Sequence, residues 1–98
     1  MYRGTTPQFV FKFPFNVSEL SVLYVTFWQG SGRKFDKTLS DSTIEGDTLT
    51  VKLTQEETLS LSPGVVNVQI RAKKPDGTAL ASNIISLDVK KILKGGEI

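Results

Sequence analysis

Residues 48–89 read TLTVKLTQEETLSLSPGVVNVQIRAKKPDGTALASNIISLDV, and they contain the clearest structural signals of the chain. Its first part alternates between polar and apolar residues, which predicts a strand from Thr48 to Leu53. Thr54 and Glu57 then match a capping box, in which each side chain hydrogen-bonds the backbone amide of the other residue. A Pro-Gly pair at 63–64 ends the segment. We therefore expect one short helix near residues 55–61, lying at one end of a pair of sheets.

The remainder of this stretch predicts a second strand and a hairpin. Residues 65–72 alternate again, with valine, isoleucine and alanine on one face. Lys74-Pro-Asp-Gly77 follows, in which proline presets φ for the first corner of a turn and glycine takes the positive φ after it. A return strand is expected over residues 78–89. Its apolar residues change parity near Ser82-Asn83, which predicts a bulge or break there.

Alternation with a period of two is also present in the first half of the chain. Phenylalanines at positions 9, 11 and 13 lie on one side of an extended segment that Pro14 ends. Residues Val22 to Gln29 are β-branched and aromatic, and they predict a strand with Leu23, Val25 and Phe27 facing inward.

Three shorter features link these strands. The segment from Gln29 to Gly32 predicts a tight hairpin. The returning strand over residues 33–39 carries Phe35 as its core residue, and its many charges are typical of a sheet edge. A short strand over residues 41–44 and a turn over residues 45–47 then lead into the strand that begins at Thr48.

About seven short strands joined by turns predict an all-β fold, an antiparallel immunoglobulin-like β-sandwich. A small Greek-key barrel is the structural alternative. The 98 residues suffice for a single domain covering residues 1–98. We expect a flexible N-terminal arm over residues 1–7 and a mobile C-terminal tail over residues 90–98.

Composition narrows the chemistry that the chain can perform. It contains no cysteine and no histidine, so thiolate chemistry and the commonest metal ligand and general base near neutral pH are absent. The net charge of +2 is too small to favour nucleic-acid binding. We expect a non-enzymatic protein with no catalytic residues, no metal and no cofactor. No apolar run is long enough for a signal peptide or a membrane span, so we expect no membrane association.

Three sequence features invite a chemical interpretation, and each has a simpler one. Gly30-Ser-Gly32 follows a strand, as phosphate-binding loops do, but lacks the lysine of such loops and reads as a hairpin turn. Carboxylates at positions 41, 45 and 47 could gather calcium, or could belong to a solvated turn. Basic residues could line one edge for an acidic partner, or could simply be solvated. This basic group comprises Arg71, Lys73, Lys74, Lys90, Lys91 and Lys94.

The outer face of the strand over residues 22–29 is the best candidate for a binding site. If Leu23 and its neighbours of the same parity form the core, then Tyr24, Thr26 and Trp28 point away from it. Exposed aromatic rings suit a protein interface, because large rigid side chains supply contact area at little entropic cost. The alternative is that Trp28 packs beneath the adjacent hairpin or the N-terminal arm. We take Tyr24, Thr26 and Trp28 as the predicted partner-binding residues.

One part of the chain resembles a known group of proteins. The order of a capped helix, the Pro-Gly stop, an alternating strand and the Lys74-Pro-Asp-Gly77 turn is similar to small tail and baseplate structural proteins of phages and prophages of Gram-positive bacteria. It is similar in particular to the immunoglobulin-like N-terminal domain of siphophage baseplate upper proteins. Two departures are Val65-Val-Asn-Val68, where that family places an aromatic residue, and the short length of this chain.

The resemblance implies a structural or adaptor module of a virion that acts by protein-protein assembly. Its partners would be other virion or baseplate proteins, or further copies of itself in a symmetric assembly. Its location would be the virion, or the bacterial cytoplasm during assembly. A carbohydrate-binding β-sandwich module that uses Tyr24 and Trp28 as a sugar platform is the alternative function.

Overall fold

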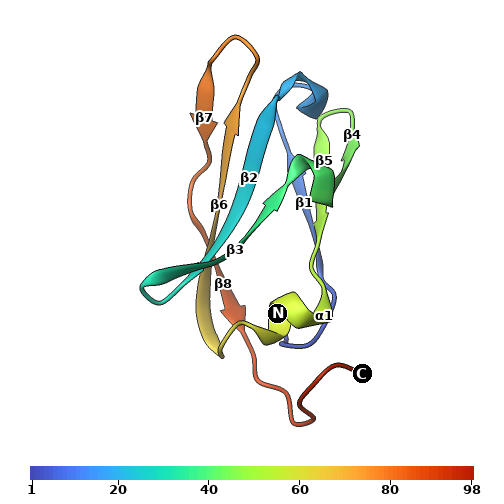
Figure 1. Cartoon of the computed structure of the whole chain (residues 1–98), viewed down its shortest axis with the longest axis vertical. Helices are drawn as coiled ribbons and strands as arrows, with labels where there is room; N and C mark the ends of the chain where they lie inside the picture. The colour runs from blue at the N-terminus through green and yellow to red at the C-terminus, as the bar shows by residue number, and fades with distance from the viewer.

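Two antiparallel sheets face each other in the computed structural model, which describes all residues 1–98 (Figure 1). Sheet I has the order β1 (Gln8–Lys12), β5 (Thr48–Lys52) and β4 (Ser42–Glu45). Sheet II has the order β3 (Gly32–Thr38), β2 (Val22–Gln29) and β6 (Gly64–Lys73), with both β7 (Ala79–Ala81) and β8 (Ile85–Val89) pairing along the far side of β6. Helix α1 (Gln55–Leu59) lies at one end, and short 3₁₀ turns η1 (Val17–Glu19) and η2 (Leu39–Asp41) connect strands.

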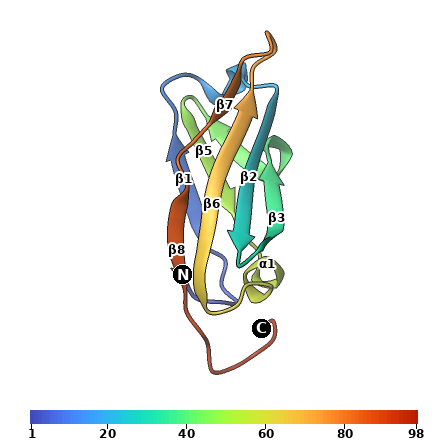
Figure 2. The ribbon, with the colours of Figure 1, turned by 90° about the vertical axis from the view of Figure 1, so that its left-hand side faces the viewer.

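The predicted all-β sandwich is confirmed. The chain contributes strands alternately to the two sheets in the manner of immunoglobulin-like domains: β1, β4 and β5 to one, and β2, β3 and β6 to the other. Figure 2 shows β8, β6, β2 and β3 side by side, with β1 and β5 behind them. Eight strands form rather than about seven because the predicted return strand over residues 78–89 divides into β7 and β8.

The core lies between the sheets and contains 14 buried residues. Alternation along the strands supplies most of them: Leu23, Val25 and Phe27 face inward from β2, and every second residue of β5 and β6 does the same. The phenylalanines of β1 are half-buried against this cluster. Phe35 stacks on Phe27 with ring centroids 4.7 Å apart, as expected for the core residue of β3.

The break between β7 and β8 follows the change of parity seen in the sequence. Leu80 pairs with the buried Ala72, whereas Ile85 pairs with the buried Val68, so an even-numbered and an odd-numbered residue both face inward. Ser82 occupies the gap. Its backbone N–H donates to Ile70 O and its Oγ accepts from Ile70 N–H, both at 2.9 Å, so one residue completes the hydrogen bonding of β6 where the ladder is interrupted.

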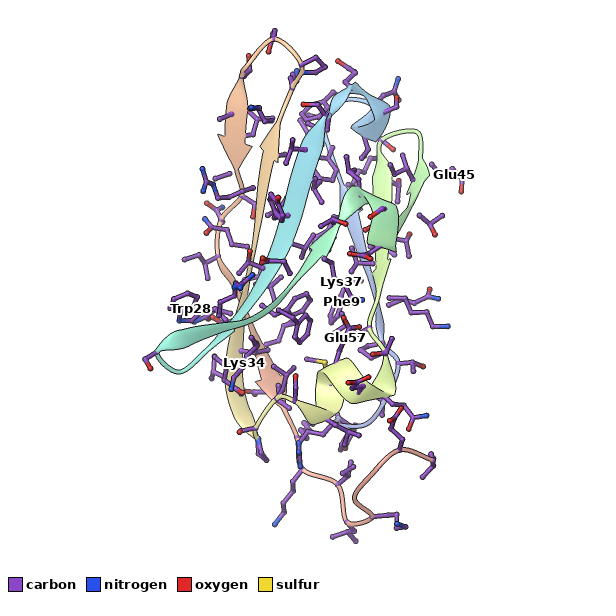
Figure 3. All side chains as sticks on the ribbon, viewed as in Figure 1. Phe9, Trp28, Lys34, Lys37, Glu45 and Glu57 are labelled. Atoms are coloured by element: carbon purple, nitrogen blue, oxygen red, sulfur yellow. The ribbon has the colours of Figure 1, made fainter.

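Helix α1 begins with the predicted capping box. Glu57 N–H donates to Thr54 Oγ1 at 3.1 Å, and Thr54 N–H donates to Glu57 Oε1 at 2.8 Å. The same carboxylate forms an ion pair with Lys37 of β3, with Nζ and Oε1 2.7 Å apart. Figure 3 shows both side chains in the space between β3 and α1. The pair therefore joins the helix to sheet II.

Both ends of the chain lie near α1. The Arg3 guanidinium donates to Leu59 O at 2.8 Å and to Leu61 O at 2.6 Å, so it satisfies carbonyl groups at the end of the helix. Gln55 exchanges two hydrogen bonds with the backbone of Ile98. The arm predicted over residues 1–7 and the tail over residues 90–98 are thus drawn toward the same end of the sandwich (Figure 1).

The hairpin between β2 and β3 contains a bulge that the sequence did not indicate. Phe27 pairs with Phe35, but Trp28 pairs with Arg33, so Lys34 has no partner on β2. The extra residue reverses the parity of β3. As a result Arg33 shares the outer face with Trp28, while Phe35 and Lys37 point inward and Lys37 is 8% exposed. No helix of the protein is long and apolar enough to cross a membrane.

Acid is expected to weaken the turn at η2. The backbone amide of Thr38, and then its hydroxyl, donate to the Asp41 carboxylate and hold the pKa of Asp41 below its ordinary value of 3.8. Because the unfolded chain then binds the proton more readily, this stabilisation is present above about pH 4 and is lost as pH falls through the folded pKa. The free energy of unfolding, measured with urea, should therefore fall between pH 5 and pH 2.5 by slightly more in the wild type than in Asp41→Asn. Equal losses in the two proteins would contradict this role of Asp41.

Candidate functional site

The outer face of sheet II carries the predicted partner-binding residues. Tyr24 and Trp28 are 46% and 43% exposed, and Thr26 is half-buried between them, while the intervening residues of β2 are in the core. Figure 3 shows Trp28 on the side of sheet II away from sheet I. We call this surface the aromatic face. It comprises Tyr24, Thr26, Trp28, Arg33, Asp36, Asn67, Gln69 and Arg71.

The Trp28 ring is held in place and remains accessible. Its Nε1–H donates to Gly30 O in the hairpin at 3.1 Å, which restrains the ring without covering it. Asn67 of β6 lies opposite Trp28 in the register of the two strands. Ile84, which is 63% exposed, lies beyond β6 in the break between β7 and β8. These residues border a shallow hollow of about 390 Å³. Of the two alternatives for Trp28, the adjacent hairpin and the N-terminal arm, the ring contacts the hairpin, and it stays 43% exposed there.

Asp36 organises the centre of the aromatic face. One carboxylate oxygen accepts from Thr26 Oγ1 at 2.6 Å, and the other forms an ion pair with Arg33. The bulge at Lys34 makes this possible, because it brings Arg33 to the outer side of the sheet. Sequence reasoning found Thr26 but missed Asp36 and Arg33, because nothing local to residues 33–36 reveals the position of a bulge.

The other end of the face surrounds Tyr24. A second hollow of about 600 Å³ lies between β2, β3 and β6, bordered by Tyr24, Arg71 and Lys73. Arg71 pairs directly with Tyr24 in the register of β2 and β6. Between the two aromatic residues the surface is polar, with Gln69 opposite Thr26. The face therefore combines two aromatic side chains with a central set of hydrogen-bonding groups.

The remaining sequence candidates are dispersed by the fold. Gly30 lies in the β2–β3 hairpin, as the simpler interpretation predicted. The Asp41 carboxylate caps η2, and no group of three carboxylates is close enough to hold a metal ion. The basic residues are also separated: Lys74 lies over the Phe15 ring, whereas Lys90 lies over Tyr2 at the opposite end of sheet II.

No family model, curated protein or solved structure matches this chain.

Proposed function

We propose that this chain is a non-enzymatic assembly module of a phage or prophage virion, in the tail or baseplate, and that its aromatic face binds another virion protein. One observation carries the binding surface: Tyr24 and Trp28 are both nearly half exposed on the same face of sheet II. A stable sandwich has no need to leave two large aromatic rings in water on the same strand. The virion context comes from the sequence resemblance.

The chemistry of the face suits a protein partner. Trp28 is held by its hydrogen bond to Gly30, so little side-chain freedom is lost on binding. Thr26, Asp36 and Arg33 already satisfy one another, so a partner need not supply a counter-charge for Asp36. Aromatic anchors around a satisfied polar centre are typical of protein interfaces, in which a few residues supply most of the binding energy.

Trp28→Ala tests the proposal. The products of the genes that flank the gene of this protein are mixed with the purified protein, and the mass of any complex is measured by light scattering. The wild type should exceed its monomer mass of 10.8 kDa, alone or with one of these proteins. Removal of the indole ring should weaken the complex by about 2 kcal/mol, or roughly thirtyfold, since tryptophan is a common hot-spot residue at protein interfaces. The melting temperature should change little.

Leu93→Ser is the matched control, because Leu93 is a fully exposed apolar side chain that lies on the C-terminal tail. It should leave the complex intact. A complex that is equally stable in Trp28→Ala and wild type would contradict the aromatic face as the interface. Binding to a glycan array that is lost in Trp28→Ala, without any protein complex, would favour the carbohydrate-binding alternative and overturn the assembly proposal.

A further inference from the structure

A second concave surface lies where the two sheets separate. An apolar groove of about 460 Å³ runs between the β1 side of sheet I and the β7–β8 side of sheet II. Its principal walls are formed by Phe11, Phe13, Phe15, Ile70, Leu80 and Ile85. The predicted partner-binding residues do not line this groove; they are Tyr24, Thr26 and Trp28 of the aromatic face. The groove is therefore a separate surface with its own chemistry.

The backbone of β1 along this groove has free hydrogen-bonding groups. Phe13 N–H donates to Asp47 O at 2.8 Å. In the register of β1 and β5, the backbone N–H and C=O groups of the odd-numbered residues therefore point toward β5. Successive residues of an antiparallel strand point their N–H and C=O groups to opposite sides. The groups of Gln8, Val10 and Lys12 therefore point away from β5, to an edge on which no strand pairs. An extended polypeptide is the ligand that such a row of alternating donors and acceptors fits.

The neighbouring edge of sheet II already accepts an extended segment. Tyr2 forms a parallel bridge with Lys90, in which Lys90 N–H donates to Met1 O at 2.7 Å and Arg3 N–H donates to Lys90 O at 3.1 Å. The N-terminus lies beside the end of β8 in Figure 2. Toward β7, no segment pairs with this edge. The groove thus continues a side of the sandwich on which the N-terminal segment already forms a β-bridge with the residue after β8.

Charge indicates the kind of segment that the groove would accept. No carboxylate lines it, whereas Lys12 lies on its wall and Lys74 lies over the ring of Phe15 at 4.5 Å. Apolar side chains alternate with polar ones along a strand, so one face of a bound segment would enter the groove and the other would meet solvent and these ammonium groups.

We propose that this groove is a strand-acceptor site, which binds an extended segment of a partner protein with alternating apolar residues and at least one acidic residue. The segment pairs with the free edge of β1 through Val10 and Lys12, and its apolar side chains fill the space between Phe13 and Leu80. The module would then have two binding surfaces of different kinds, because the aromatic face binds a folded surface and the groove binds a strand.

Selection from a displayed library of random peptides, each of about ten residues and so long enough for one strand, tests this site. Wild-type protein should enrich sequences that alternate apolar residues and contain an acid. Val10→Pro removes the outward N–H of β1 but no hydrogen bond to β5. It should therefore lower the affinity for the enriched peptides about tenfold. Val10→Thr retains the N–H and should bind as the wild type does. The Val10 and Lys12 amides should exchange with deuterium more slowly in the complex.

Further variants keep the test decisive if Val10→Pro is poorly folded. Leu80→Ser removes part of the groove wall and should also lower the affinity for the peptides. Trp28→Ala should leave this affinity unchanged. The proposal is overturned if no alternating sequence is enriched, if binding depends on Trp28 and not on Val10 or Leu80, or if the free protein forms a dimer that Val10→Pro disrupts, because the occupant would then be a second copy.

Discussion

Phe27→Ala is expected to lower the free energy of unfolding by about 4 kcal/mol, near the upper end of what a single truncation in a protein core costs. Phe27 of β2 is fully buried and is the largest of the fully buried side chains. Its ring stacks on Phe35 and lies 6.0 Å from Phe9 of sheet I, so it connects both sheets. Truncation leaves a cavity that strands on two sides cannot close, and it removes both aromatic contacts.

Urea unfolding followed by circular dichroism measures this loss. Because the free energy of unfolding of a domain is about 5–15 kcal/mol in total, the variant should be close to unfolding at 37 °C. Val10→Ala is the control: Val10 is 65% exposed on the neighbouring sheet, and its truncation should cost less than about 0.5 kcal/mol. A loss below about 1.5 kcal/mol for Phe27→Ala would mean that the two sheets are not packed around this ring.

Glu57→Ala is expected to lower the free energy of unfolding by about 3 kcal/mol, although the side chain of Glu57 is 24% exposed. The substitution removes the hydrogen bond to Thr54 N–H and, at the same time, the partner of Lys37. The lysine is almost buried, and a charge left unpaired there is costly. Chemical denaturation at neutral pH measures the loss.

Two variants separate these roles. Glu57→Gln retains an oxygen that can accept from Thr54 N–H but loses the negative charge, so it should cost about half as much as Glu57→Ala. Lys37→Met removes the buried charge and keeps most of the side-chain volume, so it should cost less than either. In the double variant Lys37→Met, Glu57→Ala, the combined loss should be smaller than the sum of the two single losses. Strict additivity would show that the ion pair contributes nothing to stability.

Much of the fold could be predicted because its signals are local. The capping box at Thr54 and Glu57, the turn around Pro75 and the alternation of β2 and β6 each depend on residues within a few positions of one another. The exposure of Tyr24 and Trp28 follows from the same alternation once the opposite face of β2 is assigned to the core. Even the break at Ser82 could be predicted, since the parity of apolar residues changes there.

Other features depend on partners that are distant in sequence. Lys37 has the parity of the inward-facing Phe35, but no residue near it in sequence indicates its ion-pair partner. That partner, Glu57, is supplied by α1. Gln29 gives no sign that its amide group exchanges two hydrogen bonds with the backbone of Ser62. Such contacts are set by the packing of whole elements, which no short window of sequence contains.

The alternation of apolar residues predicts which segments become strands, which residues of each face the core, and that Tyr24, Thr26 and Trp28 share an outer surface. Which strands pair, and therefore which edges remain free, depends on the packing of the whole chain. The groove between β1 and β7–β8 is of the second kind. The physical reason is that alternation is a property of one strand, whereas a free edge and an open groove are properties of how strands from the whole chain come together.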